Sequence, residues 1–185
     1  MKKTYFLVAS LLLFSCAKKS EIEKEFNCIS NDLDNLETIV DVQKLFSVQF
    51  PKNWKTQLYY DTTQSAIFTA DTTKQLTETV LLDVTFVNKK IMFNDAFKLQ
   101  QEQESLAKGL IQIKSKELQL LNKSAYYTLS KGKKGKFRYQ VCNTFIKINE
   151  ANFILAKTEI YGDSLVNKRM CKAFNLIKII KINNI

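Results

Sequence analysis

The side chains that could support catalysis are few, because the sequence contains no histidine. This removes the commonest general base, the commonest metal ligand, and the Ser-His-Asp and Cys-His forms of nucleophilic catalysis. There is also no Walker-type loop, GxGxxG, CxxC or EF-hand spacing. The scattered acids Asp61, Asp71, Asp83 and Asp163 show no spacing that marks a catalytic pair, although a hydrolase built on two of them is an alternative. We therefore expect a non-enzymatic protein without catalytic residues, metal or cofactor.

Cysteines are the next group with chemistry of their own. The chain has Cys16, Cys28, Cys142 and Cys171, and in an oxidising compartment two of the last three can form a disulfide. The sequence leaves three pairings open. We favour Cys28 with Cys171, because Cys142 lies in an apolar strand where it can be a small buried side chain. A catalytic thiol or a metal site is the sharper alternative, but no partner group supports it.

A run of cations, SKGKKGKFR, is the most conspicuous charged feature. Its two glycines suit a hairpin turn, and its five cations are Lys131, Lys133, Lys134, Lys136 and Arg138. Such a tip can attract lipid phosphates or other envelope polyanions, with each cation contributing about 1 kcal/mol near an anionic membrane. We favour the simpler interpretation, a solvated turn that keeps a sheet edge soluble.

Two tyrosine pairs, Tyr59 with Tyr60 and Tyr126 with Tyr127, fall in predicted strands. In a strand, one member of each pair should face the core and the other should face outward. Outward tyrosines could line a binding groove, but cross-strand packing explains them equally well and is the interpretation that we prefer.

The elements that position these residues begin with strands. We expect a short helical or irregular lead-in over 29–43, and then an alternating strand that ends at Pro51. A second strand from Trp54 to Tyr60 should pair with it as an antiparallel neighbour. SAIFTAD and the alternation from Val80 to Phe86 predict two more strands.

A helix should follow, with Asn94 as its N-cap and Gly109 after its end. Its apolar face should cover the sheet through Ala96, Leu99, Leu106 and Leu110. Later strands are predicted over 111–121, interrupted at 114–117, and over 125–130, 137–148 and 153–161. A last helix beginning at Ser164 should bury Val166, Met170, Ala173, Phe174 and Ile177. This order predicts a single α+β domain over 29–185, an antiparallel sheet flanked by helices.

The first fifteen residues have the pattern of a secretory signal. Lys2 and Lys3 precede an apolar stretch, 5–14, and small Ser15 comes before Cys16. The stretch is shorter than the about 20 apolar residues that a membrane-spanning helix needs. Removal of 1–15 takes the formal charge from +10 to +8, because the two lysines are its only charged residues. That balance favours anionic surfaces, and export makes nucleic acid an unexpected partner.

Residues Leu13, Phe14, Ser15 and Cys16 resemble the lipobox of bacterial lipoproteins. The resemblance implies cleavage before Cys16 and acylation of that cysteine, and two or more acyl chains give stable membrane anchoring. Residues 16–28 then read as a lipidated tether. Ala17 lacks the acidic inner-membrane signal of enteric bacteria, which favours the outer membrane of the cell envelope. An ordinary signal peptide or an uncleaved N-terminal anchor is the alternative.

The segment FSVQFPKNW, with the strands after it, resembles the opening of PsbP-like domains. The similarity would cover residues 44–182 and implies an α-β-α sandwich, in which the matching positions Phe46, Val48, Phe50, Pro51 and Trp54 pack the sheet. It also implies a non-enzymatic role, since PsbP-like proteins are photosystem II subunits in plants and lipoproteins in bacteria.

Three functions follow from these features, in order of preference. The first is a membrane-anchored, non-enzymatic binding or accessory module of the cell envelope, with an envelope protein or anionic lipid as partner. The second is a carrier of a small apolar or aromatic ligand, which requires a cavity between sheet and helix. The third is a carboxylate-based envelope enzyme, which requires a cleft with converging ionisable groups.

Overall fold

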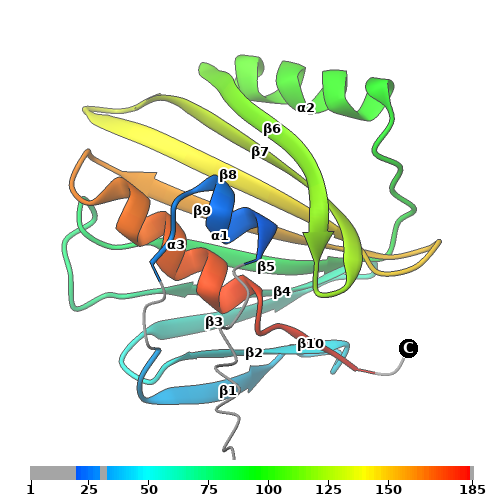
Figure 1. Cartoon of the computed structure of the whole chain (residues 1–185). Coiled ribbons are helices and arrows are strands. Elements are labelled where there is room, and N and C mark those ends of the chain that lie inside the picture. The colour runs from blue at the N-terminus through cyan, green and yellow to red at the C-terminus, as the bar shows by residue number, and fades with distance from the viewer. Residues whose placement is uncertain (1–19, 30–32, 184–185) are drawn as a thin grey trace, which may run out of the picture.

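Ten strands and three helices make up the part of the chain that the computed structural model describes, residues 20–29 and 33–183 (Figure 1). The helices are α1 (Glu21–Glu25), α2 (Asp95–Ala107) and α3 (Val166–Ile177). The strands are β1 (Leu36–Val40), β2 (Phe46–Pro51), β3 (Lys55–Tyr60), β4 (Gln64–Ala70), β5 (Leu81–Val87), β6 (Leu110–Leu120), β7 (Lys123–Lys134), β8 (Phe137–Lys147), β9 (Phe153–Tyr161) and β10 (Lys181–Ile182). The predicted α+β class is confirmed.

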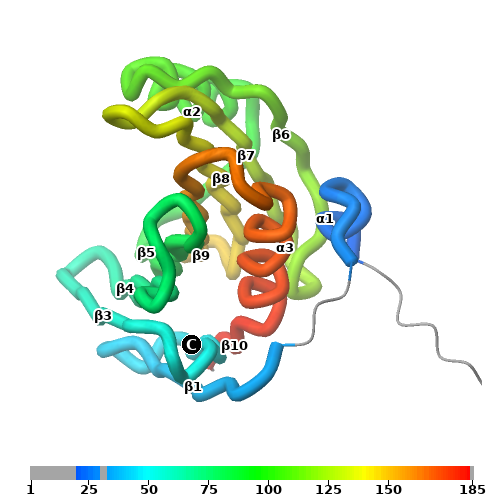
Figure 2. The backbone as a smooth tube through the Cα atoms, turned by 90° about the vertical axis from the view of Figure 1, so that its left-hand side faces the viewer, coloured from blue at the N-terminus to red at the C-terminus, as the bar shows by residue number. Residues whose placement is uncertain are grey.

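Seven strands form one antiparallel sheet in the order β3-β4-β5-β9-β8-β7-β6, and β1-β2-β10 form a second, smaller sheet. Helix α2 lies over one face of the large sheet near β6, whereas α1, α3 and the small sheet lie on the other face (Figures 1 and 2). The predicted arrangement of helices on both faces of a sheet is therefore present, with the small sheet as an addition.

The main core lies between the large sheet, α3 and the small sheet. Met170, Ala173, Phe174 and Ile177 are buried there, as the helical spacing predicted, and Val166 packs at its margin. Burying one large apolar side chain contributes about 1.5–3 kcal/mol. This shared apolar layer therefore holds α3 against the sheet.

The predicted pairing of the first two strands is wrong. Strand β2 pairs with β1 on one side and with the C-terminal β10 on the other, whereas β3 pairs with β4 in the large sheet. Pro51 and the turn before Trp54 therefore carry the chain from one sheet to the other. The small sheet is also linked to β4 by the buried Asp41, which accepts hydrogen bonds from the Phe46 amide at 2.8 Å and the Ser65 hydroxyl at 2.6 Å.

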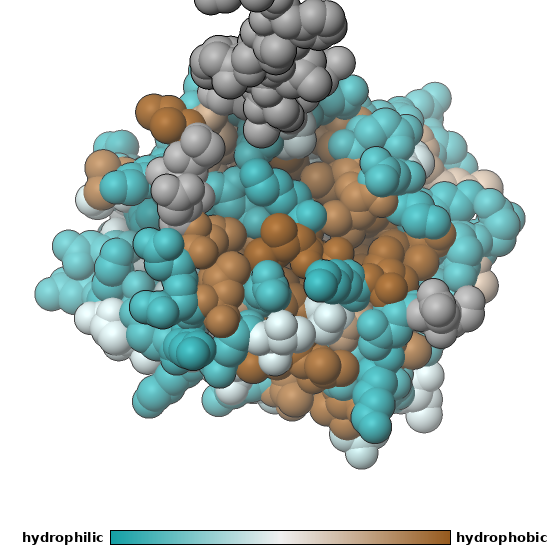
Figure 3. All heavy atoms as spheres, turned by 60° about the horizontal axis from the view of Figure 1, so that its bottom comes forward, coloured by the Kyte–Doolittle hydropathy of each residue, from teal (hydrophilic) through white to brown (hydrophobic). Residues whose placement is uncertain are grey.

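Strand β1 lies inside 29–43, which the sequence predicted to be helical or irregular. It is the outer strand of the small sheet, and three of its five residues are exposed. An edge strand with so little burial has no clear alternation, so the sequence gives no strand signal there. Figure 3 shows this side of the molecule, where apolar side chains gather amid hydrophilic ones. Ile39, Leu45 and Ile182 are only partly buried where they pack against the main core.

The predicted tether extends too far toward the C-terminus. Residues 20–29 are folded onto the domain: Ser20 and Glu23 form a capping box at the start of α1, and Ile22 and Phe26 lie in the main core. Glu23 accepts a hydrogen bond from Lys178 at 2.5 Å, which links α1 to the end of α3. Three buried apolar residues in a short charged segment are too few to show a helical period, so the sequence suggested a loose tether.

Cys28 and Cys171 form a disulfide, with Cα atoms 5.5 Å apart and a sequence separation of 143. This is the pair that the sequence analysis favoured, and it joins the segment after α1 to α3. Cys142 is free and buried in β8, where burial raises the pKa of its thiol to about 12. A thiol in that setting stays protonated and is a poor nucleophile.

Helix α2 occupies the predicted range but presents a different face. The Asn94 side chain caps it by accepting from the Phe97 amide at 3.0 Å. Leu99 and Leu106 are each 55% exposed, whereas Gln101 and Ser105 are buried against the sheet. The predicted apolar stripe is therefore wrong, and Ala96 is exposed with it.

Aromatic packing explains the orientation of α2. The Phe97 ring lies 5.1 Å from that of Phe145 and 5.9 Å from that of Tyr126, in a second small core beside the helix N-terminus. Positions four and eight after Phe97 share its face, so Gln101 and Ser105 point inward. The predicted break in β6 is instead a register shift between Gln112 and Lys114 within a continuous strand.

Candidate functional site

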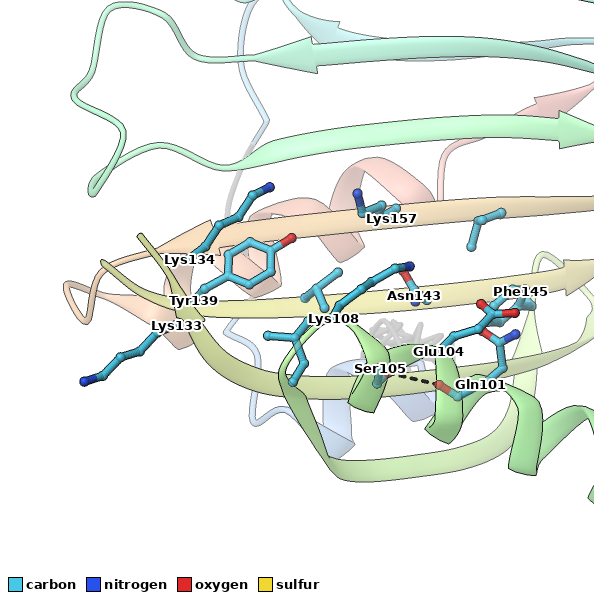
Figure 4. A pocket seen from close by; sticks show the side chains of 13 residues that line it. Gln101, Glu104, Ser105, Lys108, Lys133, Lys134, Tyr139, Asn143, Phe145 and Lys157 are labelled. Atoms are coloured by element: carbon cyan, nitrogen blue, oxygen red, sulfur yellow. Dashed lines mark hydrogen bonds between the residues drawn. The ribbon is translucent and has the colours of Figure 1, made fainter. Parts of the chain in front are cut away.

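A pocket of about 570 Å³ lies between α2 and the large sheet (Figure 4). This volume is in the range that small-molecule sites occupy. Its walls come from α2 and from strands β6 to β9: Gln101, Glu104, Ser105, Lys108, Leu110, Lys133, Lys134, Tyr139, Val141, Asn143, Phe145, Leu155 and Lys157. The orientation of α2 produces this pocket, because the helix turns polar side chains rather than leucines toward the sheet.

The floor of the pocket is apolar. Val141 and Phe145 alternate along β8 and Leu155 projects from β9, while Leu110 closes the end near β6. Alternation places residues 139, 141, 143 and 145 on the same face of β8. Tyr139 and Asn143 therefore stand beside the apolar side chains as polar groups.

The roof combines hydrogen-bonded polar groups with one acid. The Ser105 hydroxyl donates to the Gln101 carbonyl oxygen at 3.0 Å and accepts from the Ser130 hydroxyl of β7 at 3.0 Å. The bond from Ser130 links the underside of α2 to β7 in this part of the helix. Glu104 accepts from the Gln100 side chain at 2.8 Å on the same helix.

Four lysines border the pocket, and they differ in their partners. The Lys134 ammonium lies 5.1 Å from the centre of the Tyr139 ring and 5.4 Å from that of Tyr161, and it is 3.6 Å from the Glu159 carboxylate. Lys157 also forms an ion pair with Glu159. The Lys133 side chain points away from the Tyr139 ring in Figure 4.

Glu159 and Asp83 are the acids that accompany Lys157. Burial alone would raise the pKa of Glu159, but the hydrogen bond from Lys157 and the charges of Lys157 and Lys134 outweigh it and lower that pKa. Asp83 lies opposite Lys157 in the β5–β9 pairing. There burial raises the pKa of Asp83, against the hydrogen bond from Thr85 and the charge of Lys157. The two carboxylates are thus shifted in opposite directions.

The predicted cationic tip is divided by the structure. The β7–β8 hairpin turns at Gly135 and Lys136, as expected. Lys134 belongs to the pocket, and Arg138 forms an exposed ion pair with Asp163 at 3.4 Å. Lys131, Lys133 and Lys136 form no ion pair within residues 20–29 and 33–183. Contact of the tip with an anionic surface stays a prediction.

The other acids noted in the sequence stabilise turns. Asp61 accepts from the amides of Thr63 and Gln64, and Asp71 accepts from the Thr73 hydroxyl at 2.6 Å. Asp163 is part of the surface pair with Arg138. Within the described ranges, no group of three or more His, Cys, Asp and Glu side chains could hold a metal ion.

Neither tyrosine pair has the predicted one-in, one-out arrangement. Tyr59 and Tyr60 are 54% and 64% exposed, because β3 is an edge strand. Tyr126 and Tyr127 are both buried, because the sheet is covered on both faces at β7.

The signal segment, the lipobox and Cys16 lie outside the described residues, so their predictions stay predictions. In the part of the chain that is described, no helix has the length and apolar character needed to cross a membrane.

Similarity to known proteins is found at the level of structure. No protein-family model and no curated protein matches the sequence. The solution structure of cyanobacterial PsbP from Synechocystis has a TM-score of 0.54 at 9% identity, and the match covers 84% of this chain and 97% of that one. The yeast (Saccharomyces cerevisiae) Ran-binding protein Mog1p has a TM-score of 0.52 at 7% identity, over 80% and 95% of the two chains.

This chain has the PsbP and Mog1 fold. A crystal structure from Bacteroides thetaiotaomicron is similar as well, with a TM-score of 0.56 at 6% identity. That match covers 81% of this chain, which spans about half (49%) of the larger protein. The fold implied by the FSVQFPKNW resemblance is therefore confirmed. At these identities the likeness concerns the fold alone.

Of the pocket residues, the sequence analysis singled out only Lys133 and Lys134, as part of the predicted cationic tip. Lys108 and Lys157 lie in different elements, and neither belongs to a motif. The one available signal was the alternation of Tyr139, Val141, Asn143 and Phe145, which places two polar and two apolar groups on one strand face. Its meaning depended on the orientation of α2, which the sequence pattern mispredicted.

Proposed function

We propose that the protein is a non-enzymatic binding module of the bacterial cell envelope, held at a membrane outside the cytoplasm by acyl chains on Cys16. The observation that carries this proposal is the Cys28–Cys171 disulfide in a chain that begins with a secretory-type segment. Structural disulfides persist in oxidising compartments and are rare in the cytosol. Disulfide and leader therefore support the same location independently.

The position of the disulfide also suits a membrane anchor. Cys28 lies twelve residues after Cys16, and its bond to Cys171 fixes the start of the domain to α3. Only residues 17–19 then separate the acylated cysteine from the capping box at Ser20. A tether this short would hold the domain close to the bilayer.

Labelling with an alkyne fatty acid, combined with cell fractionation, tests the anchor. The wild-type chain should be labelled and should sediment with membranes, whereas Cys16→Ala should lose the label. Cys142→Ala is the matched control, because it removes a buried thiol and should keep both label and membrane association. A processed, unlabelled wild-type protein in the soluble fraction would overturn the proposal.

A second candidate function is favoured by the pocket under α2. A carrier of a small ligand needs a cavity between sheet and helix, and this one combines an apolar floor with polar groups from α2 and β8. Binding of a small molecule is compatible with a module that delivers or senses that molecule at the membrane. The carrier function can be tested separately from the anchor.

A further inference from the structure

We propose that the pocket under α2 binds a single-tailed amphiphile with an anionic head group, its tail on the floor and its head among Lys108, Lys157 and Asn143. The inference gives the ligand class for the carrier function proposed above, and it does not depend on acylation of Cys16.

The floor selects an apolar tail. Val141 is separated from Phe145 and Leu155 by Asn143 and Lys157, which lie opposite each other on the same face. Phe145 and Leu155 themselves offer adjacent apolar surface from two neighbouring strands. These two residues are directly opposite each other in the β8–β9 register. A tail laid along them would remove apolar surface from water, which contributes about 25 cal/mol per Å².

The charge at the rim selects an anion. Lys134 and Lys157 share one carboxylate, that of Glu159. Lys108 forms no ion pair within the described residues. Lys133 is the fourth lysine that lines the pocket, where Glu104 is the one acid among the lining residues. With Glu159 and Asp83, which lie beside Lys157, three acids are set against four lysines, so one positive charge is left uncompensated.

A neutral donor completes the head-group site. Figure 4 shows the Tyr139 hydroxyl and the Asn143 amide on the same side of the sheet as the Lys108 and Lys157 side chains. Burial and a hydrogen bond to the Glu159 carboxylate raise the pKa of Tyr139, so its hydroxyl stays protonated but already donates to Glu159. The Asn143 amide is then the neutral donor left for a head group. A donor of this kind can bind a carboxylate or phosphate alongside lysine.

Other ligand classes fit less well. A cation would be repelled by the lysines. A neutral apolar molecule would bury lysine charges without pairing them, which is unfavourable. A sugar would leave the Phe145 and Leu155 surface without an apolar partner. An anionic amphiphile is the ligand class that matches both the apolar floor and the lysines at the rim.

Photoaffinity labelling of the full-length, membrane-extracted protein tests this assignment. The probe is a medium-chain fatty acid that carries a diazirine in its tail, and the labelled peptides are located by mass spectrometry. We expect labels in the segments 101–110 and 139–145, competed by excess unlabelled fatty acid. An alkyl phosphate of the same chain length as competitor distinguishes the two head-group chemistries, and competition by either supports the proposal.

Variants separate head from tail. Lys108→Gln with Lys157→Gln should weaken labelling by the acid about tenfold, the loss expected for about 1.4 kcal/mol of binding free energy. Labelling by the corresponding alcohol probe should be weak and unaffected by the same change. Leu155→Trp should block both probes by filling the floor. The matched control is Lys52→Gln with Lys55→Gln, two exposed lysines of which Lys55 lies on β3, the opposite edge of the sheet.

The outcomes are distinct. Equal labelling by acid and alcohol, with no effect of the Lys108 and Lys157 changes, would overturn the anionic head group. Labels confined to other segments would overturn the pocket itself. Either result would leave the membrane-anchor proposal intact, since that proposal depends on Cys16 and is measured by fractionation.

Discussion

Glu23 shows how one charged residue can fix a peripheral helix to the core. Burial would raise its pKa, but hydrogen bonds from Lys178 and Ser20 and the charge of Lys178 lower it from 4.5 to about 2. The folded protein therefore binds fewer protons here than the unfolded chain between these pH values. The stability that the pair contributes is present above about pH 4.5 and is lost as the pH falls toward about 2.

Removing this carboxylate should thus reduce stability only where it is ionised. We expect Glu23→Gln to lower the free energy of unfolding by about 1–3 kcal/mol at neutral pH, since hydrogen bonds to charged groups contribute amounts of this order. Near pH 2.5 the difference from wild type should shrink. Urea unfolding of both proteins at neutral and acidic pH measures this. Glu37→Gln, at an exposed site on β1, is the control for net charge, and a pH-independent difference would contradict the prediction.

At the scale of elements, α2 is the informative case. We expect Leu99→Lys and Leu106→Lys to change the free energy of unfolding by less than about 0.5 kcal/mol, because both side chains face outward. Phe97→Ala should cost about 2–4 kcal/mol, because it removes the ring that packs on Phe145 and Tyr126. Chemical denaturation of the three variants separates the two faces. A large loss in Leu106→Lys would mean that the leucine face is the packed one.

The same helix marks where sequence reasoning succeeds and fails. Its ends were predictable, because the Asn94 cap and Gly109 act locally. Its buried face was not predictable, because the packing of Phe97 on Phe145 and Tyr126 determines the orientation of the helix and leaves the leucines exposed. Strands β2, β3 and β5 were predicted from alternation, whereas the edge strand β1 carries no alternation to detect.

The pocket illustrates the limit for sites. It is assembled from α2 and four strands, so no short segment contains its pattern. Lys108 and Lys157 become candidate binding residues only when their neighbours in the folded protein are known. In contrast, the Cys28–Cys171 pair could be favoured in advance, because only three pairings existed and Cys142 lay in an apolar strand.

At the scale of the whole molecule, the disulfide joins the N-terminal segment to the rest of the fold. It closes a loop of 143 residues, and a crosslink over so long a loop removes much of the freedom of the unfolded chain. We expect Cys28→Ser with Cys171→Ser to lower the free energy of unfolding by about 2–5 kcal/mol. Denaturation with and without reductant measures this: reductant should lower the stability of the wild type and leave the double variant unchanged.

Loss of the disulfide should be felt most strongly in α1. Without it, α1 is held by apolar contacts of Ile22 and Phe26, by the pair of Glu23 with Lys178, and by ion pairs of Glu25 with Lys114 and Lys116. Limited proteolysis of the double variant should therefore cut first near residues 20–29, while β4 to β9 stay protected. Residues 20–29 follow closely after Cys16 in the sequence. If Cys16 carries a membrane anchor, the disulfide connects that anchor covalently to α3 and not to α1 alone. Equal protection of α1 in both proteins would show that the noncovalent contacts suffice.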